Sequence, residues 1–583
     1  MSSRFPWPTR VGAPLAIAVW SDGAMVAARR EHETVVEPLG FDDVRRLDSE
    51  VGPRWVTWSQ HTVRHLVAAE VRLTRCWDLA AVHRLAVGGH RAEPQAVWAR
   101  LHGLPPPAPI AGGRSDMPDL FHEHDRFPDP DQPLHGDGAL HAGWSDDTPQ
   151  PSAAHAGVWA RLALAAADLQ HRWIAESGSA RLDTTARSES AIELLCAELR
   201  RDGLPIDLTA AEQLLSNLIG PRPATEFDIA AARAAHDQLV LRHAPNGSAF
   251  DLRSPGQVRS LLRRVGIEVP DTRAWRLERL VDAHPLIPDL LRWRKLERIA
   301  TTYGYGWLDQ YVAEGPTAGT HRLRGDWDGA DGAAGRMTAT AGLHNLPREL
   351  RSFIAADPGH RFVRADLGQI EPRVLAAISG DPSLIAACSE ADLYLPVARR
   401  LAVDRPAAKV AMLGAMYGQT TGLGAAALRG LRSSYPVAMA FLDQADAAAQ
   451  VGTDLFTFGG RRVPMWRAPA TEFAESDLRR QAAARGRYGR NAMVQGAAAE
   501  LFKTWAVTVR ARLAGTESQI VLCLHDELLI HAPMAETDRV AAILSGALAE
   551  AAHRTYAPTA PAALAVRFPI DLAIVGSWAE AKS

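Results

Sequence analysis

The sequence contains little cysteine and no long apolar run. Its four cysteines are far apart and include no Cys-x-x-Cys pair: Cys76, Cys196, Cys388 and Cys523. This spacing suggests neither a disulfide framework nor a zinc site. No stretch of eighteen or more apolar residues occurs, so no transmembrane helix is expected. The first ten residues, MSSRFPWPTR, lack the basic-then-apolar order of a signal peptide. Together these absences predict a protein of the reducing cytoplasm with no membrane partner.

The chain also lacks an excess of charge of either sign. Its 583 residues carry 64 basic and 67 acidic side chains, which gives a formal net charge of -3. This balance does not mark a nucleic-acid-binding protein. It does not exclude one either, because binding needs a local basic surface and not a basic total. The length exceeds that of one typical domain, so two or more domains are expected.

The first part of the chain is predicted to be a mixed α/β domain with an insert. PLAIAVW and GAMVAAR predict a β-hairpin, and RWVTW predicts a later strand. Residues 104–154 are rich in Pro, Gly, Asp and His without a sustained apolar period, which predicts a flexible insert. Metal binding by its histidines is the alternative. The apolar period is helical over 156–174 and again over 190–300, where exposed helix faces or contact with DNA would explain the cationic character.

Two aspartates stand where apolar strands are predicted to end. Asp366 closes HRFVRAD, a helix is predicted to begin near Ile370, and Asp526 lies in the turn of the predicted hairpin SQIVLCLHDELLIHAP. If the two strands are neighbours, both carboxylates lie on one rim of a sheet and must share a proton or a cation. Mg²⁺ suits such ligands together with substrate phosphates, and two such ions can clamp an in-line phosphoryl displacement. Taken alone, each aspartate is also typical of a simple turn.

A second set of polar residues follows one helix face. DRPAAKVAMLGAMYGQ predicts a helix with Asp404 as N-cap. Within it, the residues Arg405, Lys409, Leu413 and Tyr417 recur at intervals of four and form one stripe. A guanidinium, an ammonium, an apolar contact and a phenol in this order suit phosphates at the helix N-terminus and a base further along. The alternative is an amphipathic helix whose Arg and Lys stems lie along apolar surface.

A second stripe occurs in RYGRNAMVQG. Arg487, Asn491 and Gln495 are again spaced by four, on a predicted Ala-rich helix. Such a stripe can donate hydrogen bonds to the minor groove of a nucleic acid, or it can simply face solvent.

Taken together, these motifs resemble family A DNA polymerases of the bacterial DNA polymerase I type. The matching residues occur in the order Arg336, Asp366, Gln369, Glu371, Arg405, Lys409, Tyr417, Gln495, His525, Asp526 and Glu527. The similarity runs from about residue 190 to the C-terminus and includes NGSAFDLRSPGQVRSLL, GRMTATAGLHNLP and VGSWAEA. It implies an α/β (α+β) fold, with an RNase H-like N-terminal domain and a right-hand polymerase domain made of palm, fingers and thumb.

The resemblance also implies domain boundaries. An RNase H-like 3′–5′ exonuclease-like domain is expected over 1–185, with its insert at 104–154, and a polymerase domain over 186–583. The expected subdomains are the thumb at about 186–330, the palm at about 331–380 and 496–583, and the fingers at about 381–495.

Catalytic roles follow from the resemblance. Asp366 and Asp526 would bind two Mg²⁺ ions, with Mn²⁺ as an alternative, and Glu527 would support that site. Arg405 and Lys409 would grip the triphosphate, and Lys409 would also serve as the general acid for pyrophosphate.

Other residues are implied to contact the nucleotide or the DNA. Glu371 matches the family's steric gate, which disfavours a ribose 2′-hydroxyl, and Tyr417 would lie at the templating position. Gln369 and Leu413 are further implied nucleotide contacts. The implied primer–template contacts are Arg336, Asn345, Arg487, Asn491, Gln495 and His525. The implied partners are primer–template DNA and deoxynucleoside triphosphates, for a cytoplasmic, nucleoid-associated monomer.

Two departures from the family pattern bear on the expected activities. Leu413 stands where the family usually has Phe or Tyr. Leucine lacks the flat ring that packs on the incoming nucleotide, so we expect weaker nucleotide binding or altered sugar discrimination and not inactivity. The first strand, in LAIAVWSDGAM, lacks the Asp-x-Glu that proofreading requires; Asp78 and Asp168 are further carboxylates of this domain. We therefore expect an exonuclease fold without exonuclease activity.

The expected function is template-directed DNA synthesis from a primer 3′ end, in replication or repair. Three alternatives stay open. A relative of single-subunit RNA polymerases is disfavoured by Glu371 and by the thumb-like helices. A non-catalytic DNA-binding scaffold is disfavoured by the intact Asp366, Lys409 and Asp526. A weakly active 3′–5′ exonuclease is the third.

Overall fold

The computed structural model separates into two compact units. It describes residues 7–8, 10–31, 33–107, 132–144, 149–247, 249–332, 334–418, 424–466 and 475–581. The first unit comprises Met1–Asp202, Asp326–Thr338 and Gly359–Ile574, and the second comprises Gly203–Gly325, Ala339–Pro358 and Val575–Ser583. Residues 108–131 and 145–148, most of the insert predicted at 104–154, lie outside the described residues. The domain and subdomain boundaries expected from the sequence stay predictions.

The first unit begins with a five-stranded sheet of order β3-β2-β1-β4-β5. Its strands are β1 (Pro14–Trp20), β2 (Gly23–Arg30), β3 (Glu33–Leu39), β4 (Arg54–Thr57) and β5 (Cys76–Asp78). β1, β2 and β3 pair antiparallel, whereas β1, β4 and β5 pair parallel. The hairpin predicted for β1 and β2 and the strand predicted at RWVTW are confirmed, and the fold is consistent with the expected RNase H-like domain.

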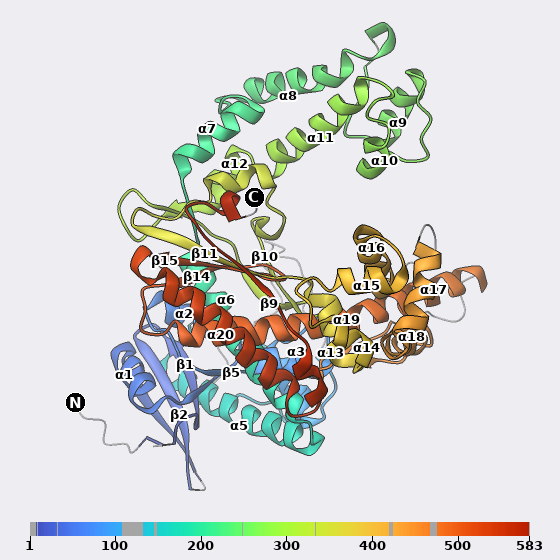
Figure 1. Ribbon diagram of the computed structural model, residues 1–583. Helices are drawn as coiled ribbons and strands as arrows, with labels where there is room; N and C mark the ends of the chain where they lie inside the picture. Colours follow the sequence, from blue (N-terminus) through green and yellow to red (C-terminus); the bar gives the residue numbers. More distant parts are fainter. Residues whose placement is uncertain are drawn as a thin grey trace. The chain divides into compact units, whose positions relative to one another are not determined.

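Helices cover both faces of this sheet. They are α1 (Phe41–Val51), α2 (Gln60–Ala68), α3 (Leu79–Val87), α4 (Pro94–His102), α5 (Ala153–Ser177) and α6 (Ala180–Asp202). Successive residues of β1 point to opposite faces. Leu15 and Ile17 pack in the core with residues of α1, α2 and α6, whereas Ala16 and Ala18 pack with residues of α3, α4 and α5. Figure 1 shows α5 alongside β1 and β2.

The described part of the predicted insert adds to this core. Leu140 and Trp144 are buried there, and the Trp144 ring stacks on Trp159 of α5 with ring centroids 5.5 Å apart. Residues 132–144 therefore close over the side of the sheet that α5 covers.

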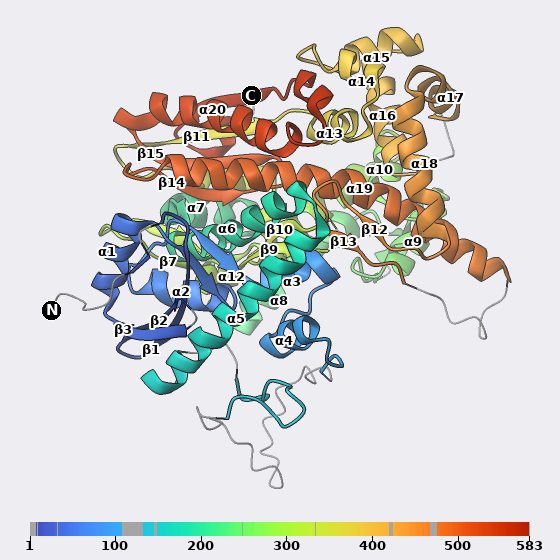
Figure 2. The ribbon, with the colours of Figure 1, turned by 90° about the horizontal axis from the view of Figure 1, so that it is seen from below.

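A second sheet of the first unit has the strand order β14-β15-β11-β16. Its strands are β11 (His360–Leu367), β14 (Gln519–Cys523), β15 (Glu527–Pro533) and β16 (Ile570–Val575). β15 pairs antiparallel with both β11 and β14. The helix α20 (Thr537–Tyr556) packs on β11 and β15, and α19 (Glu475–Arg512) packs on α20 and β14 (Figure 2). The hairpin, strand and long helix predicted for these segments are confirmed.

A helical region joins β11 to α19. It contains α13 (Ile370–Ser379), α14 (Pro382–Ala387), α15 (Tyr394–Leu401), α16 (Arg405–Met416), α17 (Gly424–Ser434), α18 (Pro436–Gln450) and the short strands β12 (Leu455–Phe456) and β13 (Arg462–Val463). α16 begins as predicted, because the Asp404 carboxylate accepts a hydrogen bond from the Ala407 N–H at 2.7 Å. Two further strands, β9 (Trp327–Asp331) and β10 (Arg336–Ala339), pair with each other.

Buried ion pairs fasten α19 to α6. The Lys503 ammonium and the Arg461 guanidinium both pair with Glu189, and each of these three side chains is at most 4% exposed. Nearer the end of α19, Arg510 pairs with Glu198 at 2.6 Å. α6 therefore packs with the first unit along much of its length.

The second unit is mainly helical. It contains α7 (Leu208–Ile219), α8 (Glu226–Leu241), α9 (Pro255–Arg264), α10 (Ala274–Glu278), α11 (Leu286–Thr302) and α12 (Tyr305–Tyr311), with β6 (Leu204–Ile206), β7 (Val312–Glu314) and β8 (His321–Leu323) in a three-stranded sheet. Its core joins α8, α9, α10 and α11 through residues such as Val240, Leu261, Leu277 and Leu290. The helices predicted over 190–300 are thereby confirmed.

The expectations about membrane spans and cysteines can be compared with the structure. No helix among the described residues is both long enough and apolar enough to cross a membrane. All four cysteines are buried as free thiols. Burial raises the pKa of each thiol, to about 12 for Cys388.

The contact between α18 and α19 depends on glycine. A Cβ placed on Gly489 would lie 2.5 Å from the Ala449 Cβ, too close for two real atoms. We predict that Gly489→Ala lowers stability by about 1–2 kcal/mol, because overpacking exceeds the gain of about 1 kcal/mol in helix propensity. Gly546→Ala on α20 is the matched control, since its added Cβ meets nothing within 4 Å. Thermal melting should show a lower midpoint for the first variant and a higher one for the second; equal shifts would refute the packing argument.

Candidate active site

Asp366 and Asp526 come together because β11 and β15 are neighbours. Asp366 lies opposite Glu527 in the antiparallel register. The Leu367 N–H donates to the Asp526 carbonyl at 2.7 Å, and the Leu524 N–H donates to the Glu527 carbonyl at 2.8 Å, which closes the turn that carries Asp526. The sequence prediction that both aspartates lie on one rim of a sheet depended on this pairing, and the pairing is confirmed.

A buried arginine that the sequence analysis missed joins these carboxylates. Arg364 is fully buried, and its guanidinium pairs with Asp366, with Glu527 at 2.9 Å and with Asp571 at 3.0 Å. Burial alone would lower the pKa of Arg364, but the hydrogen bond to Glu527 and the charges of Glu527 and Asp366 raise it. The signal was available: Arg364 precedes Asp366 by two residues in an apolar strand, so both point to the same face.

The donor set suits a cation that is shared with a substrate. Within the ranges that the structure describes, no group of three or more His, Cys, Asp or Glu side chains is arranged to hold a metal ion. Mg²⁺ does not require such a cage, since it usually takes one or two carboxylates plus phosphate oxygens and water. Asp366, with its side chain 18% exposed, and Asp526 at the rim can supply carboxylate oxygens of that kind.

A group of hydrogen-bonded side chains centred on Glu371 also lies in the first unit. Glu371, in the first turn of α13, accepts from the Arg336 guanidinium at 2.6 Å through one oxygen and from the Tyr417 hydroxyl at 2.8 Å through the other. Gln495 of α19 lies beside Tyr417 and acts to lower its pKa. The structure therefore brings together four of the residues singled out in the sequence, from β10, α13, the end of α16 and α19.

The charges and hydrogen bonds around Glu371 favour the protonated form of Tyr417. Burial, and then the charge and the hydrogen bond of Glu371, raise the pKa of Tyr417 to about 12, although Arg336 and Gln495 act in the opposite direction. Nearby, loss of hydration and then the charge of Arg336 lower the pKa of His525. At neutral pH Tyr417 is thus a hydrogen-bond donor to Glu371.

The N-terminus of α16 is tied to α13 through a second missed residue, Asp392. Its carboxylate accepts from the Arg405 guanidinium and from the Gln369 amide at 2.8 Å. Burial alone would raise the pKa of Asp392, but the hydrogen bonds from Arg405, the Tyr394 N–H and Gln369 lower it. Gln369 has a φ of +60°, a strained backbone conformation that is often found at functional sites.

The remaining predicted residues are distributed more widely. Lys409 is exposed and has no ion pair among the residues that the structure describes, whereas Leu413 is half-buried on the same helix. Arg487 and Asn491 lie on α19, and the Asn491 side-chain oxygen is buried without a hydrogen-bond partner in the described ranges. Asn345 belongs to the second unit, where its carbonyl accepts from Arg298 and Tyr303.

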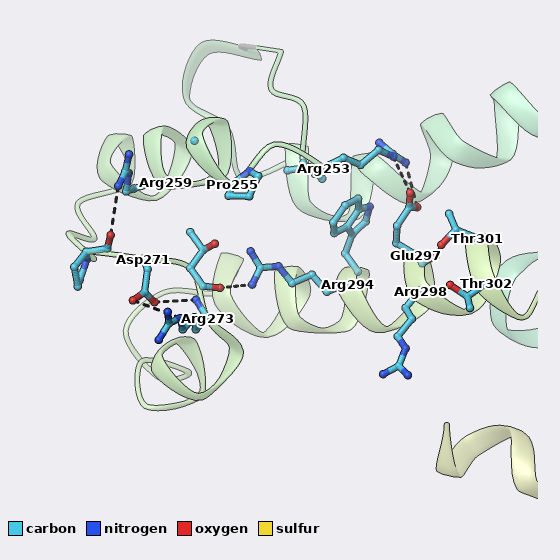
Figure 3. Close-up of a pocket in the computed structure, with 15 residues that line it drawn as sticks. Arg253, Pro255, Arg259, Asp271, Arg273, Arg294, Glu297, Arg298, Thr301 and Thr302 are labelled. Carbon is cyan, nitrogen blue, oxygen red and sulfur yellow. Dashed lines mark hydrogen bonds and ion pairs between the residues drawn. The ribbon is translucent and has the colours of Figure 1, made fainter. Parts of the chain in front are cut away.

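The second unit contains a cationic pocket of its own. A cavity of about 790 Å³ lies between α9, the segment around Asp271 and α11, and Figure 3 shows several arginines along it. Arg253 is neutralised by Asp237 at 2.9 Å and Glu297 at 2.7 Å. Arg294 instead donates to the Thr272 carbonyl, and burial lowers its pKa. Arg259 and Arg298 likewise donate to backbone carbonyls, so these guanidinium groups keep a positive charge that can attract a phosphate backbone.

Asp78 and Asp168, the two aspartates singled out in the N-terminal domain, both have hydrogen-bond or ion-pair partners. Asp78 is fully buried and caps α3 by accepting from the Ala81 N–H at 2.8 Å. Asp168 pairs with Arg29 at 2.6 Å. Each therefore has a structural partner within the domain.

Comparisons with known proteins agree with this arrangement. A family model described as DNA polymerase family A matches residues 228–580, more than half of the chain. The chain therefore belongs to DNA polymerase family A.

Two curated relatives and one solved structure show how far the similarity extends along the chain. DNA polymerase I of Chloroflexus aurantiacus is 33% identical over 299 residues, which cover 46% of this chain and 30% of that protein. DNA polymerase I of Bacillus subtilis is 26% identical over 493 residues, which cover 78% of this chain and 51% of that protein. The POL domain of Pol1 from M. smegmatis, in complex with DNA primer-template and dNTP, shares the fold with a TM-score of 0.67, 21% identity and coverage of 99% of this chain and 97% of that one.

The chain spans only part of the length of these curated relatives, from 30% of the Chloroflexus aurantiacus protein to 51% of the Bacillus subtilis protein. The likeness to the M. smegmatis structure, at 21% identity, concerns the fold.

The Arg364 ion pairs lead to a stability prediction. Arg364→Met should destabilise the protein by roughly 3–5 kcal/mol at neutral pH, because it leaves carboxylates without their cation. The unpaired carboxylates would acquire raised pKa values, so the deficit should grow as pH rises and shrink as pH falls. Thermal melting between pH 5 and pH 8, with and without Mg²⁺, measures both effects, and Mg²⁺ should raise the midpoint of the variant more than that of the wild type.

Arg361→Met is the matched control, since Arg361 is exposed on the same strand. A surface change of this kind should alter stability by less than about 0.5 kcal/mol. Equal losses in the two variants would show that Arg364 is not the compensating charge.

Proposed function

We propose that this chain is a template-directed DNA polymerase that adds deoxynucleotides to a primer 3′ end by two-metal phosphoryl transfer, in replication or repair synthesis. The observation that carries the proposal is the pairing of β11 with β15, which brings Asp366 beside the turn of Asp526 in a member of DNA polymerase family A. The complex of the M. smegmatis relative with DNA primer-template and dNTP supports the same partners here.

The reaction breaks the O–H bond of the primer 3′-hydroxyl, whose proton passes to water. It forms a bond between that oxygen and the α-phosphorus and breaks the bond to pyrophosphate. Asp366 and Asp526 would hold two divalent cations, whose chemistry is to activate the 3′-hydroxyl and to neutralise the leaving pyrophosphate. Arg364 limits the repulsion between Asp366 and Glu527, so the site persists without relying on cations alone.

The exposed stripe of α16 would bind the triphosphate. Lys409 is an exposed ammonium and would neutralise phosphate charge and donate a proton to pyrophosphate. Arg405 is held by Asp392, so an incoming triphosphate would compete with that carboxylate for the guanidinium. The Gln369 amide donates to the same carboxylate, so its hydrogen bond to Asp392 would change when Arg405 moves to the triphosphate.

Glu371 would discriminate against ribonucleotides by occupying the space of a 2′-hydroxyl. Both of its oxygens are engaged, by Arg336 and Tyr417, which fixes the carboxylate in one position. A fixed side chain excludes a substituent more effectively than a mobile one, since it cannot move aside at low cost. Arg336, His525 and the α19 stripe would contact the primer–template, together with Asn345 and the cationic pocket of the second unit.

The N-terminal domain would be a structural remnant without 3′–5′ exonuclease activity. The engagement of Asp78 as a helix cap and of Asp168 by Arg29 supports this, because neither is left available as part of a two-metal site.

The first test is primer extension with a 5′-labelled primer–template and Mg²⁺, comparing deoxynucleotides with ribonucleotides. Templated extension with deoxynucleotides is expected. Asp366→Ala and Asp526→Ala should each reduce it at least 100-fold, since a cation ligand is lost. Glu371→Ala should admit ribonucleotides. A lane without nucleotides should show no primer shortening.

The outcomes separate the candidate functions. Extension by Asp366→Ala at the wild-type rate would refute the two-metal assignment. DNA binding by the wild type without any extension would favour the non-catalytic scaffold, and primer shortening that requires Mg²⁺ would favour the exonuclease.

Leu413 gives a separate prediction. Leu413→Phe should lower the KM for deoxynucleotides several-fold, because a ring at this half-buried position adds a stacking surface for the base. Steady-state single-nucleotide insertion measures the effect. Val410→Phe, exposed on the same helix, is the matched control and should leave KM unchanged. An unchanged KM in Leu413→Phe would remove this residue from the nucleotide site.

A further inference from the structure

An aromatic pair lies exposed beside the first half of α19. The rings of Trp466 and Tyr488 meet edge to face, with centroids 5.1 Å apart and an interplanar angle of 69°. The two residues are 45% and 36% exposed. Neither residue belongs to the site described above. Large aromatic side chains that remain exposed together are typical of binding surfaces.

The position of Trp466 is fixed by the residue before it. The Met465 N–H donates to the Asp454 carboxylate at 2.8 Å. The Met465 side chain is buried with Ala449 of α18 and Ala492 of α19. Trp466 therefore follows a segment that is anchored on both helices, next to the turn of α19 that carries Tyr488.

The rotation of α19 is fixed by its contact with α18. A Cβ on Gly486 would lie 1.9 Å from the Asp446 carboxylate, so a larger residue there would displace that side chain. The opposite side of α19 carries the stripe of Asn491 and Gln495. At 100° per residue, Tyr488 and Gln495 differ in direction by only about 20°, and they are about 10 Å apart along the axis. Tyr488 thus continues this stripe toward the start of the helix.

The pair also lies next to the position proposed for the templating base. A Cβ on Gly418 would lie 2.8 Å from the Arg487 Cγ, so the residue before Tyr488 packs against the residue after Tyr417. Gln495, on the same stripe, lies beside Tyr417 and acts to lower its pKa. A strand that passes Tyr417 along α19 would therefore meet Tyr488 and Trp466 next.

The local charge favours a nucleic acid. Arg487 is exposed and has no ion pair within the part of the chain that the structure describes. By contrast, Arg479 and Arg480, earlier on α19, are paired with Glu475 and Asp477. An exposed aromatic pair beside an unpaired guanidinium combines a stacking surface with a phosphate contact.

We propose that Trp466 and Tyr488 form a stacking site for an unpaired base of the template strand, ahead of the templating position, with Arg487 on its phosphate. The inference rests on the proposed function. The proposed function accounts for binding of the duplex and the nucleotide, and the stacking site would bind the single-stranded template overhang in addition. Stacking tolerates any base, so the site would hold the overhang without reading its sequence.

The test compares binding of two DNA molecules without nucleotides present. One is a primer–template with a 5′ template overhang and the other is the same duplex with blunt ends, and fluorescence anisotropy gives each affinity. Trp466→Ala and Tyr488→Ala should reduce the preference for the overhang about tenfold, the equivalent of ~1.4 kcal/mol. Affinity for the blunt duplex should stay unchanged. Trp466→Phe and Tyr488→Phe should retain most of the preference.

A second readout places 2-aminopurine in the overhang, where stacking on the pair should quench its fluorescence in the wild type and not in the alanine variants. Trp275→Ala is the matched control, because Trp275 is also 45% exposed but lies on α10 of the second unit. This variant should keep the overhang preference.

The outcomes keep the two proposals distinct. If the protein extends primers but the alanine variants keep the wild-type preference and quenching, the stacking site is refuted and the polymerase stands. Equal losses for overhang and blunt DNA would also refute it, since they indicate a structural role. A protein that extends no primer and binds neither DNA refutes the proposed function and the site together.

Discussion

The first unit depends on one buried guanidinium at the centre of its second sheet. Arg364 lies on β11, between β15 and β16 in the strand order, and it pairs with Asp366 on its own strand, with Glu527 on β15 and with Asp571 on β16. Carboxylates brought this close would repel one another in a buried setting. Because Arg364 offsets that repulsion, the strands of this sheet can pair while Asp366, Glu527 and Asp571 lie close to one another.

The same principle extends away from the rim. Glu371 is shared by Arg336 and Tyr417, Asp392 by Arg405 and Gln369, and Glu189 by Arg461 and Lys503. In each case one carboxylate links elements that are distant in the chain. Such ion pairs add little net stability compared with apolar packing, but removing one partner is costly. They therefore link α6, α13, α16 and α19 through groups whose single removal would be costly.

Local structure was largely predictable from the sequence, whereas the roles of the candidate site residues stay predictions. The hairpin that carries Asp526, the strand and helix around Asp366 and the N-cap of α16 follow from periodicity and capping, which act over a few residues. The partners of Arg364 and Asp392 were missed. Arg364 and Glu527 are 163 residues apart, and Arg364 and Asp571 are 207 apart, so no local pattern signals their contact. The pairing of Trp466 with Tyr488 was missed for the same reason, because it requires the contact between α18 and α19.

The four buried cysteines have a practical consequence. Alkylating reagents attack the thiolate, and burial both shields these sulfur atoms and raises their pKa values, so the native thiols should react slowly under folded conditions. One cysteine introduced at an exposed position of each unit could then be labelled without first removing the native ones. Fluorophores or spin labels placed in each of the two units would report the distance between them in solution, with the chain otherwise unaltered.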